Sequence, residues 1–340
     1  MPVKLSNPDL AAAASKAQAK DSPQDQADRT SMPDIVPLTA AEFLRLELPP
    51  RQKIVAPWLP EKGLVMVYSP SGVGKTLLGM TSAYAIAAGA DFLGFKVERS
   101  RKVLYIDGEM PAQTMQERLA AIVNGFAKQP PTPEHFRILI SDLSENGLPD
   151  LATPGGQAWF DTQVGDAEVI LLDNISTLVR SGKENEAEAW LPIQSWALRH
   201  RRASRTIVFC HHAGKGGAQR GTSRREDVLD TVISLRRPAD YTPDQGARFE
   251  VHYEKYRGFY GDEAQPFVAR YEVRDGAAAW TRSEIVDVER ARVVAALQEG
   301  MSIREAAESL GLHRSKVERL RKKAIDNGEL SPGLTSEAAE

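Results

Sequence analysis

The segment whose residue types most clearly indicate chemistry is Ser69–Thr76, which reads Ser-Pro-Ser-Gly-Val-Gly-Lys-Thr. It matches the phosphate-loop pattern G-x-x-x-x-G-K-[ST] except at its first position, where a small serine replaces glycine. Gly72 and Gly74 let the backbone curl so that its N–H groups face phosphate oxygens. Lys75 can reach the β- and γ-phosphates, and the Thr76 hydroxyl is a ligand for Mg²⁺. The segment therefore predicts binding of ATP and Mg²⁺ by Ser69, Pro70, Ser71, Gly72, Val73, Gly74, Lys75 and Thr76.

The sequence on either side supplies the elements that a phosphate loop needs. Leu64–Tyr68 is an apolar run that predicts a buried strand, and the residues from Lys75 to about Ala88 predict a helix that stops at Gly89. A helix that begins at the loop adds the positive end of its dipole to the phosphate site. A glycine-rich turn with a surface lysine would lack this context, so a nucleotide site is the preferred interpretation.

Two acidic groups follow strand-like runs at positions that suit nucleotide hydrolysis. The run Val169–Leu172 leads to Asp173, which places this carboxylate at the sheet edge beside the loop, where it can hold Mg²⁺. The run Val103–Ile106 leads into Asp107-Gly108-Glu109, and Glu109 can orient and deprotonate the attacking water. The alternative for either acid is that it only begins a loop or caps a helix.

Strand-like and helix-like runs alternate along the central part of the chain, which predicts an α/β fold with a mostly parallel sheet covered on both faces. Helical stripes are expected within Met115–Phe126 and Trp190–Leu198. After residue 228 the chain becomes rich in strands, and we expect these to extend the sheet as antiparallel strands. The further expected strands are Phe136–Ile140, Thr206–Cys210, Val232–Leu235, Phe249–Tyr253 and Phe267–Val273.

Composition and charge limit the class of protein. A single cysteine, Cys210, excludes an intrachain disulfide and fits a reducing cytoplasm, and its apolar surroundings predict a core position. The net charge is −3, so any basic surface must be local. No apolar run approaches the roughly 20 residues that span a bilayer, and the N-terminus lacks a secretory pattern, so we expect no membrane partner. Residues 1–35 have a composition typical of disorder.

Four segments together resemble RepA-type hexameric replicative helicases and their relatives among the RecA/DnaB-like P-loop ATPases. They are the phosphate loop, the run Val-Leu-Tyr-Ile-Asp-Gly-Glu, the run Leu-Leu-Asp and residues Val208–Gly216, and the resemblance covers about residues 53–274. It implies a RecA-like fold, with Glu109 as the catalytic base, Asp173 as a Mg²⁺ ligand and His212 as a sensor of the γ-phosphate. The alternative is that His211 and His212 are ordinary polar residues at the end of a strand, with no role in sensing phosphate.

The segment Glu254–Gly258 resembles the basic finger of ring ATPases. The resemblance implies that Lys255 and Arg257 reach the γ-phosphate bound by a neighbouring subunit, where their charge stabilises the transition state. It therefore implies a homo-oligomer, with a hexamer expected. The alternative is a solvated pair on an edge strand. The catalytic residues expected on these grounds are Lys75, Glu109, His212, Lys255 and Arg257.

Two loops face nucleic acid in ATPases of the kind that the sequence resembles. The first corresponds to Arg180–Glu186, whose mixed charges are uninformative. The second, Gly214–Arg225, carries several cations among glycines, which suits phosphate contact, so Lys215 and Arg220 are predicted to bind DNA. The alternative is a solvated surface loop, and neither loop has an aromatic residue on which a base could stack.

The C-terminal segment fits a helix-turn-helix pattern. Ile303–Leu310 predicts the first helix, Gly311 supplies a left-handed turn, and Val317 and Leu320 pack the second helix back. His313, at the expected start of the second helix, is a weak capping type that the sequence does not explain. Cations dominate this helix, as DNA binding requires, although a bundle for protein contacts is the alternative. The predicted DNA-binding residues here are Arg314, Ser315, Lys316, Arg319 and Lys322.

These interpretations divide the chain into a disordered segment (1–35), a RecA-like ATPase domain (36–283), a helix-turn-helix DNA-binding domain (284–330) and a tail (331–340). The favoured function is an ATP-hydrolysing, DNA-dependent motor, like an oligomeric RepA-type helicase or replication protein of a plasmid or mobile element. One alternative is an ATP-switched DNA-binding regulator or recombination accessory protein without unwinding activity. Another is a nucleotide-dependent scaffold with no DNA role.

Overall fold

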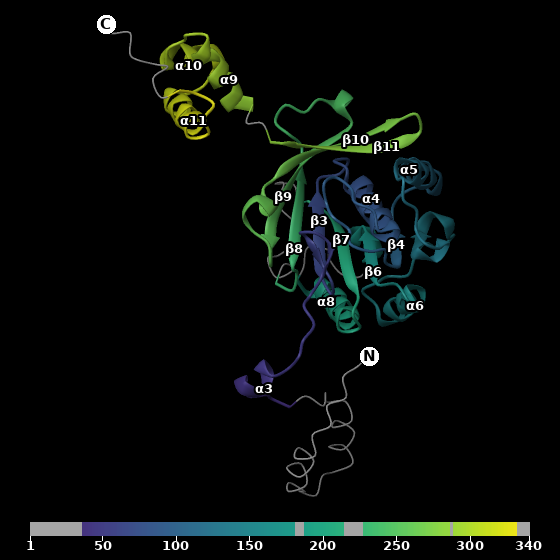
Figure 1. Cartoon of the computed structure of the whole chain (residues 1–340). Coiled ribbons are helices and arrows are strands. Elements are labelled where there is room, and N and C mark those ends of the chain that lie inside the picture. Colours follow the sequence, from purple (N-terminus) through teal and green to yellow (C-terminus); the bar gives the residue numbers. More distant parts are fainter. Residues whose placement is uncertain (1–35, 181–186, 214–226, 286–287, 332–340) are drawn as a thin grey trace, which may run out of the picture. The chain divides into compact units, whose positions relative to one another are not determined.

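The computed structural model describes residues 36–180, 187–213, 227–285 and 288–331. One nine-stranded sheet, in the order β11-β10-β9-β8-β3-β7-β6-β4-β5, organises the residues from 51 to 285 (Figure 1). A separate two-stranded ribbon pairs β1 (Lys53–Val55) with β2 (Leu59–Pro60). The strands of the large sheet are β3 (Leu64–Ser69), β4 (Val103–Asp107), β5 (Phe136–Ile140), β6 (Val169–Asp173), β7 (Thr206–His212), β8 (Thr231–Arg236), β9 (Ala247–Tyr256), β10 (Phe267–Arg274) and β11 (Ala277–Glu284).

Six neighbouring strands, from β8 to β5 in the sheet order, run parallel. The central strands β3, β4, β6 and β7 have both faces covered, which is why their sequences are apolar at nearly every position. Successive residues point to opposite faces, and each face has its own core cluster. In β3, Val65 and Val67 belong to the first cluster, whereas Leu64 and Met66 belong to the second.

Helices cover both faces of the sheet, as the sequence predicts. The first cluster contains α4 (Lys75–Ala88) and α5 (Ala112–Gly125), and the second contains α6 (Pro154–Val164), α7 (Ile175–Leu178) and α8 (Ala187–Arg202). The phosphate loop joins β3 to α4, and β7 lies between β3 and the strand that ends at Asp173. This is the RecA-like P-loop arrangement. Short 3₁₀ turns occur at Pro133–His135, Ser141–Leu143, Pro243–Gln245 and Gly261–Ala264.

The helix α6 is absent from the sequence-based expectations. Two glycines lie in its first turn. Because glycine has a low helix propensity, the sequence does not predict a helix here. The Thr153 side chain compensates as the N-cap, because it accepts the backbone N–H of Gly156 at 3.0 Å. Phe160 is fully buried, so tertiary packing supplies the rest of the stability.

The direction of β8 corrects one prediction. Val232–Leu235 was expected to be antiparallel, but β8 pairs parallel with β3, in the register Val65 to Thr231. A run of alternating residues fixes which side chains face the core, but it does not encode the direction of the chain. The expectation is confirmed for β9 and β10, which pair antiparallel, and β9 also pairs antiparallel with β8.

The sequence analysis also does not predict the last strand, β11. Its residues are mostly small or polar, which is atypical of strands. The Asp275–Gly276 pair before it carries the signal that was missed, since φ is 51° at Asp275 and 75° at Gly276. An Asp-Gly pair with two positive φ angles is the favoured two-residue hairpin turn. The Trp280 side chain then packs on the first cluster and donates its ring N–H to Thr81 Oγ1 at 3.1 Å.

Three helices, α9 (Val288–Gln298), α10 (Ile303–Leu310) and α11 (Arg314–Asp326), form the predicted helix-turn-helix around a small core of their own. Gly311 has the expected left-handed conformation, with φ of 64°. Ser302 and Glu305 form a reciprocal capping box at the start of α10. His313 caps α11 by accepting the backbone N–H of Ser315 at 3.4 Å, and its Nδ1 also lies 2.8 Å from the Ser315 hydroxyl. The ring nitrogen of His313 is therefore the N-cap acceptor, in place of the usual side-chain oxygen.

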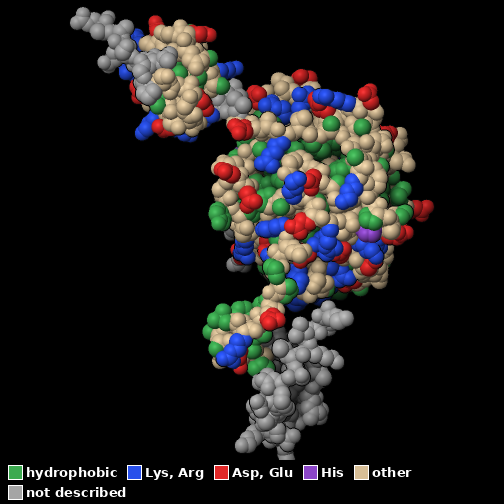
Figure 2. Space-filling model, viewed as in Figure 1, with side chains coloured by type: hydrophobic (Ala, Val, Ile, Leu, Met, Phe, Trp, Pro, Cys, Tyr) green, Lys and Arg blue, Asp and Glu red, His purple; other side chains and the backbone are tan. Residues whose placement is uncertain are grey.

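The residues before Arg51 belong to a unit of their own. Its described part contains one short helix, α3 (Ala40–Leu44), with a capping box between Thr39 and Glu42. Several large apolar side chains are exposed along this segment and gather visibly in Figure 2. They are Val36, Leu38, Phe43, Leu44 and Leu48. None of the helices in the described ranges is both long and apolar enough to cross a membrane.

A truncation at Ile285 should leave the core folded, whereas one at Gly276 should not. The longer chain keeps β11, and the shorter chain loses Trp280, a loss comparable to a buried Trp→Ala change of about 3–5 kcal/mol. All tryptophans of the chain lie outside the three C-terminal helices, so tryptophan fluorescence reports the core alone. We expect an unfolding midpoint within a few degrees of the full chain for the longer variant only. Equal loss in both variants would show that the core needs the C-terminal helices.

Candidate functional site

Four strands of the parallel sheet end in polar residues at the same edge. Ser69 and His212 are register partners on β3 and β7, and Asp107 and Asp173 are register partners on β4 and β6. Each lies two residues after a member of the first core cluster on its own strand. Because strand residues two positions apart point to the same face, all four lie on the α4 side of the sheet. A cavity of about 220 Å³ lies at this edge. Its lining includes the predicted residues Lys75, Thr76, Glu109, Asp173 and His212.

The phosphate loop has the backbone that its glycines predict. The φ angle is 74° at Gly72 and 136° at Gly74, which side-chain-bearing residues rarely adopt. A Cβ atom on Gly74 would lie 2.5 Å from a ring carbon of Phe249, on β9. Gly74 is therefore required twice, once by its conformation and once by the ring packed against it. The loop leads directly into α4, whose N-terminus points its free N–H groups at the loop.

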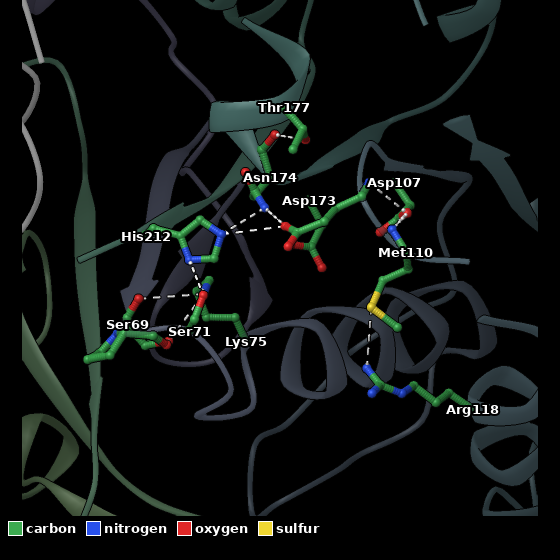
Figure 3. Close-up of polar contacts among 12 residues, drawn as sticks. Ser69, Ser71, Lys75, Asp107, Met110, Arg118, Asp173, Asn174, Thr177 and His212 are labelled. Carbon is green, nitrogen blue, oxygen red and sulfur yellow. Dashed lines mark hydrogen bonds and ion pairs between the residues drawn. The ribbon is translucent and has the colours of Figure 1, made fainter. Parts of the chain in front are cut away.

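Lys75 is held at the floor of the cavity by the ends of two strands. Its side chain is 6% exposed, and burial lowers its pKa below the ordinary value. The Nζ atom lies 3.3 Å from Ser69 Oγ, 3.5 Å from the Ser69 carbonyl oxygen and 3.2 Å from His212 Nδ1 (Figure 3). Nearby carboxylates, including Asp173 and Glu109, raise the pKa again, and so favour the charged form.

A chain of contacts joins Lys75 to Glu109 through His212. The Nδ1 atom of His212 faces Lys75 and lies 3.4 Å from Ser71 Oγ, and its Nε2 lies 3.5 Å from Glu109 Oε2. The side-chain amide of Asn174 donates to the same Glu109 oxygen and lies 3.1 Å from His212 Nε2 (Figure 3). The neighbouring residue His211 is fully buried and points to the opposite face, because successive strand residues alternate.

Asp173 is buried beside the loop, where the sequence places it. Burial raises its pKa, while hydrogen bonds from the hydroxyls of Tyr105 and Thr76 and the charge of Lys75 oppose the rise. The Tyr105 hydroxyl donates to Asp173 Oδ2 at 2.7 Å. A hydroxyl and a buried carboxylate at the end of a phosphate loop form the donor set that suits Mg²⁺, so Thr76 and Asp173 fit the ion that the sequence predicts.

Asp107 occupies the corresponding position on the neighbouring strand. Burial raises its pKa from 3.8 to about 7, the backbone N–H of Met110 lowers it, and the charge of Asp173 adds to the rise. One carboxylate oxygen accepts the backbone N–H groups of Glu109 and Met110, at 3.1 and 2.7 Å. Asp107 thus shapes the turn that carries the predicted catalytic base.

Comparison with known protein families agrees with this geometry. The profile of the AAA domain family matches residues 26–218, more than half of the chain. The chain belongs to the AAA domain family. A second profile, described as a Homeodomain-like domain, matches residues 284–330 and so covers the helix-turn-helix. The protein is therefore a P-loop ATPase domain joined to a DNA-binding helix-turn-helix.

Solved structures with a similar fold include two archaeal proteins. The flagellar accessory protein FlaH from Methanocaldococcus jannaschii matches with 15% identity and a TM-score of 0.45, over 65% of this chain and 90% of its own. The KaiC-like protein PH0186 from Pyrococcus horikoshii OT3 matches with 13% identity and a TM-score of 0.46, over 68% of this chain and 98% of its own.

Two further residues that contact the site carry no clear signal in the sequence. Asn174 follows Asp173 directly, so its position beside the Walker-type aspartate is the only available cue. Arg237 follows β8 and donates to the Gly72 carbonyl oxygen at 2.6 Å. It also donates to the Gly246 carbonyl oxygen at 2.9 Å, and its guanidinium lies 3.8 Å from the centre of the Tyr241 ring. Arg237 thereby ties the phosphate loop to the connection between β8 and β9.

The structure separates the predicted finger residues from the phosphate loop of their own chain. Lys255 pairs with Val232 near the start of β8, and Arg257 follows the end of β9. Because β8 runs parallel to β3, these positions lie at the N-terminal edge of the parallel strands, opposite the cavity. Arg257 donates to the Asp227 carbonyl oxygen at 3.3 Å. A role at the chain's own γ-phosphate is thus excluded, and a role in a neighbouring subunit stays a prediction.

The predicted DNA-binding residues of α11 differ in their surroundings. Lys316 is 2.8 Å from Glu289 on α9, and Arg314 is 3.2 Å from Glu318 one turn along. Arg319 and Lys322 are exposed and have no ion pair within the described ranges. In Figure 2 the basic side chains of these three helices are interspersed with acidic ones. The free cations on α11 are therefore fewer than the sequence suggests. The other predicted DNA contacts, Lys215 and Arg220, lie outside the described residues.

The two loop glycines give a matched pair of variants. Gly74→Ala should displace Phe249 and abolish binding of a fluorescent ADP analogue, because the new Cβ meets the ring at 2.5 Å. Gly72→Ala also has positive φ, but its Cβ would meet no atom within 4 Å, so we expect a loss of only about 1–3 kcal/mol in stability and measurable binding. Equal binding losses in the two variants would mean that the packing against Phe249 is unimportant.

Proposed function

We propose that the AAA domain hydrolyses MgATP in a DNA-dependent manner, as the motor of an oligomeric RepA-like helicase or replication protein of a plasmid or mobile element. The observation that most supports hydrolysis is the chain of contacts from Lys75 through His212 to Glu109. It connects the cation that binds terminal phosphates to the carboxylate proposed as the base. A site that only held nucleotide would need the first group but not the second.

Matching of donors and acceptors defines the role of His212 in this chain. The Lys75 ammonium can only donate, so His212 Nδ1 must accept from it, and the proton of a neutral ring then lies on Nε2. That N–H points to Glu109 Oε2, at 3.5 Å, and the side-chain amide of Asn174 donates to the same oxygen, so the two donors meet around one acceptor and fix the orientation of the carboxylate. Movement of Lys75 toward a γ-phosphate is thereby coupled to the orientation of Glu109.

Thr76 and Asp173 are the residues proposed to hold Mg²⁺. The bound ion would neutralise charge on the phosphate oxygens. Asp173 is kept in place by the Tyr105 hydroxyl, which occupies one of its oxygens. The Lys75 cation offsets part of the negative charge of Asp173 and Glu109, and the side-chain amide of Asn174 donates to Glu109 beside His212.

The partner proposed for the C-terminal helices is duplex DNA. Support comes from the match to a homeodomain-like family and from the exposed cations Arg319 and Lys322 on α11. An oligomer, with a hexamer expected, is proposed because Lys255 and Arg257 lie at the sheet edge opposite their own phosphate loop. Such residues can act on nucleotide only when another subunit brings its cavity to them.

An ATP-switched DNA-binding regulator or recombination accessory protein is the second candidate. The observation that favours it is the helix-turn-helix itself, because a motor that tracks along DNA does not need a domain that reads sequence. The two candidates differ in one measurement. Strand separation of a forked duplex during ATP hydrolysis supports the motor, and DNA-stimulated hydrolysis without separation supports the regulator.

Glu109→Gln should bind MgATP with an affinity close to that of the wild type but hydrolyse it at least 100-fold more slowly. The amide keeps the shape of the carboxylate and cannot accept the proton. Lys75→Ala is the matched variant that should lose both nucleotide binding and turnover, because Lys75 is the buried cation that faces the loop. Phosphate release with and without DNA measures turnover. Turnover of Glu109→Gln within a few-fold of wild type would place the base elsewhere.

Arg319→Ala should weaken duplex DNA binding more than Arg304→Ala. Both arginines are exposed, but Arg304 lies on α10 and pairs with Glu308, so it serves as the control. If Arg319 contacts a phosphate, a plot of the logarithm of the DNA association constant against the logarithm of the salt concentration should become less steep by about 0.9. If it contacts a base, about 1–3 kcal/mol of sequence discrimination should disappear. Fluorescence anisotropy over a salt series distinguishes these cases, and unchanged affinity in both variants would assign α11 to protein contacts.

A further inference from the structure

Asp107 is a buried carboxylate with one oxygen that the proposed reaction does not use. The residue is 1% exposed and lines the cavity. Its Oδ1 accepts the backbone N–H groups of Glu109 and Met110, whereas its Oδ2 has no hydrogen-bond partner in the part of the chain that the structure describes. A buried carboxylate oxygen without a donor is destabilising because it has lost its hydration without gaining a partner, so its position calls for a ligand.

A second buried oxygen atom of the same cavity also lacks a hydrogen-bond donor among the described residues. Asn174 is 2% exposed, and its Oδ1 also lacks a donor within the described ranges, while its Nδ2 donates to Glu109. Both residues line the cavity together with Thr76 and Asp173. An ionised carboxylate oxygen and an amide oxygen are both acceptors, so a cation or a group that supplies hydrogen-bond donors would satisfy them, whereas a further carboxylate or phosphate oxygen would not.

The register of the sheet places Asp107 next to the proposed ion ligand. Asp107 and Asp173 are direct partners on β4 and β6, and neighbouring strands lie about 4.8 Å apart. Two buried carboxylates this close repel each other unless a cation or its bound water lies near them. Mg²⁺ keeps several of its waters in such sites, and these waters present O–H groups outward.

We propose that Asp107 is a positioning residue for the divalent cation, with its Oδ2 accepting a hydrogen bond from a water molecule bound to the ion and Asn174 Oδ1 accepting from another. The inference rests on the proposed MgATP site and adds a residue to it. Because the other oxygen of Asp107 holds the Glu109 turn, one carboxylate links the position of the ion to the position of the base.

Asp107→Asn tests this inference selectively in the full-length protein. The amide oxygen can still accept the N–H groups of Glu109 and Met110, but the second oxygen becomes an N–H₂ donor that repels the ion-bound water. A fluorescent ADP analogue is titrated in EDTA, and then Mg²⁺ is titrated at fixed nucleotide. We expect affinity in EDTA to be unchanged or higher, and the Mg²⁺ concentration at half-effect to rise about 10-fold, as for other residues that orient metal ligands. Asp166→Asn, at an exposed carboxylate, is the control and should match the wild type.

The outcomes separate the inference from the function on which it rests. A Mg²⁺ half-effect within two-fold of wild type would overturn the role of Asp107, and so would an equal loss of affinity in EDTA, which indicates a merely structural residue. If Asp107→Asn does not fold, Asp107→Ser keeps a turn acceptor and is measured in its place, with the same expected result. If wild type binds the nucleotide but shows no Mg²⁺ dependence, the inference fails alone. If wild type does not bind the nucleotide, the proposed function fails and the inference with it.

Discussion

Burial of the parallel strands on both faces is the constraint on which the rest of the molecule depends. Helices cover each side of the sheet, so a charged side chain within a central strand would lose its hydration without gaining a partner. The carboxylates of the central strands therefore appear where these strands end. On the side covered by α4, the last residues of four strands are Ser69, Asp107, Asp173 and His212. The site is thus a consequence of the way that a doubly covered sheet terminates.

The same constraint explains how much of the fold the sequence predicts. Apolar runs of four or five residues locate β3, β4, β6 and β7 correctly, because nothing else in the chain can fill a doubly buried layer. Their ends are predicted short. The structure adds Ser69 to β3, Asp107 to β4 and His212 to β7, each of which pairs in register with its neighbour. The change from apolar to polar residues predicts the end of a strand, whereas these residues are still part of their strands, and Asp107 and His212 line the cavity.

The parts of the site that the sequence does not reveal depend on contacts between distant segments. Arg237 reaches the Gly72 carbonyl oxygen from a position 165 residues further along the chain, and no local pattern distinguishes it from Arg236. Asn174 acts through Glu109, in the turn after β4, and His212, at the end of β7. The ion pair between Lys316 and Glu289 also joins distant segments. The number of cations on α11 does not show that an acid on α9 already pairs with one of them. Motifs identify residue types, and only packing shows which charges are already paired.

One strand, β9, connects the two ends of the proposed chemistry. Near its start, Phe249 packs under Gly74 of the phosphate loop, and near its end Lys255 lies at the opposite edge of the sheet. Phe249 and Lys255 are six positions apart, which corresponds to about 20 Å at 3.4 Å per residue. β9 pairs with β10 over residues 247–251, and its pairing with β8 shifts register between Tyr253 and Lys255. If the finger acts on a neighbour, a single strand contributes both to the packing beneath its own phosphate loop and to the cavity of the next subunit.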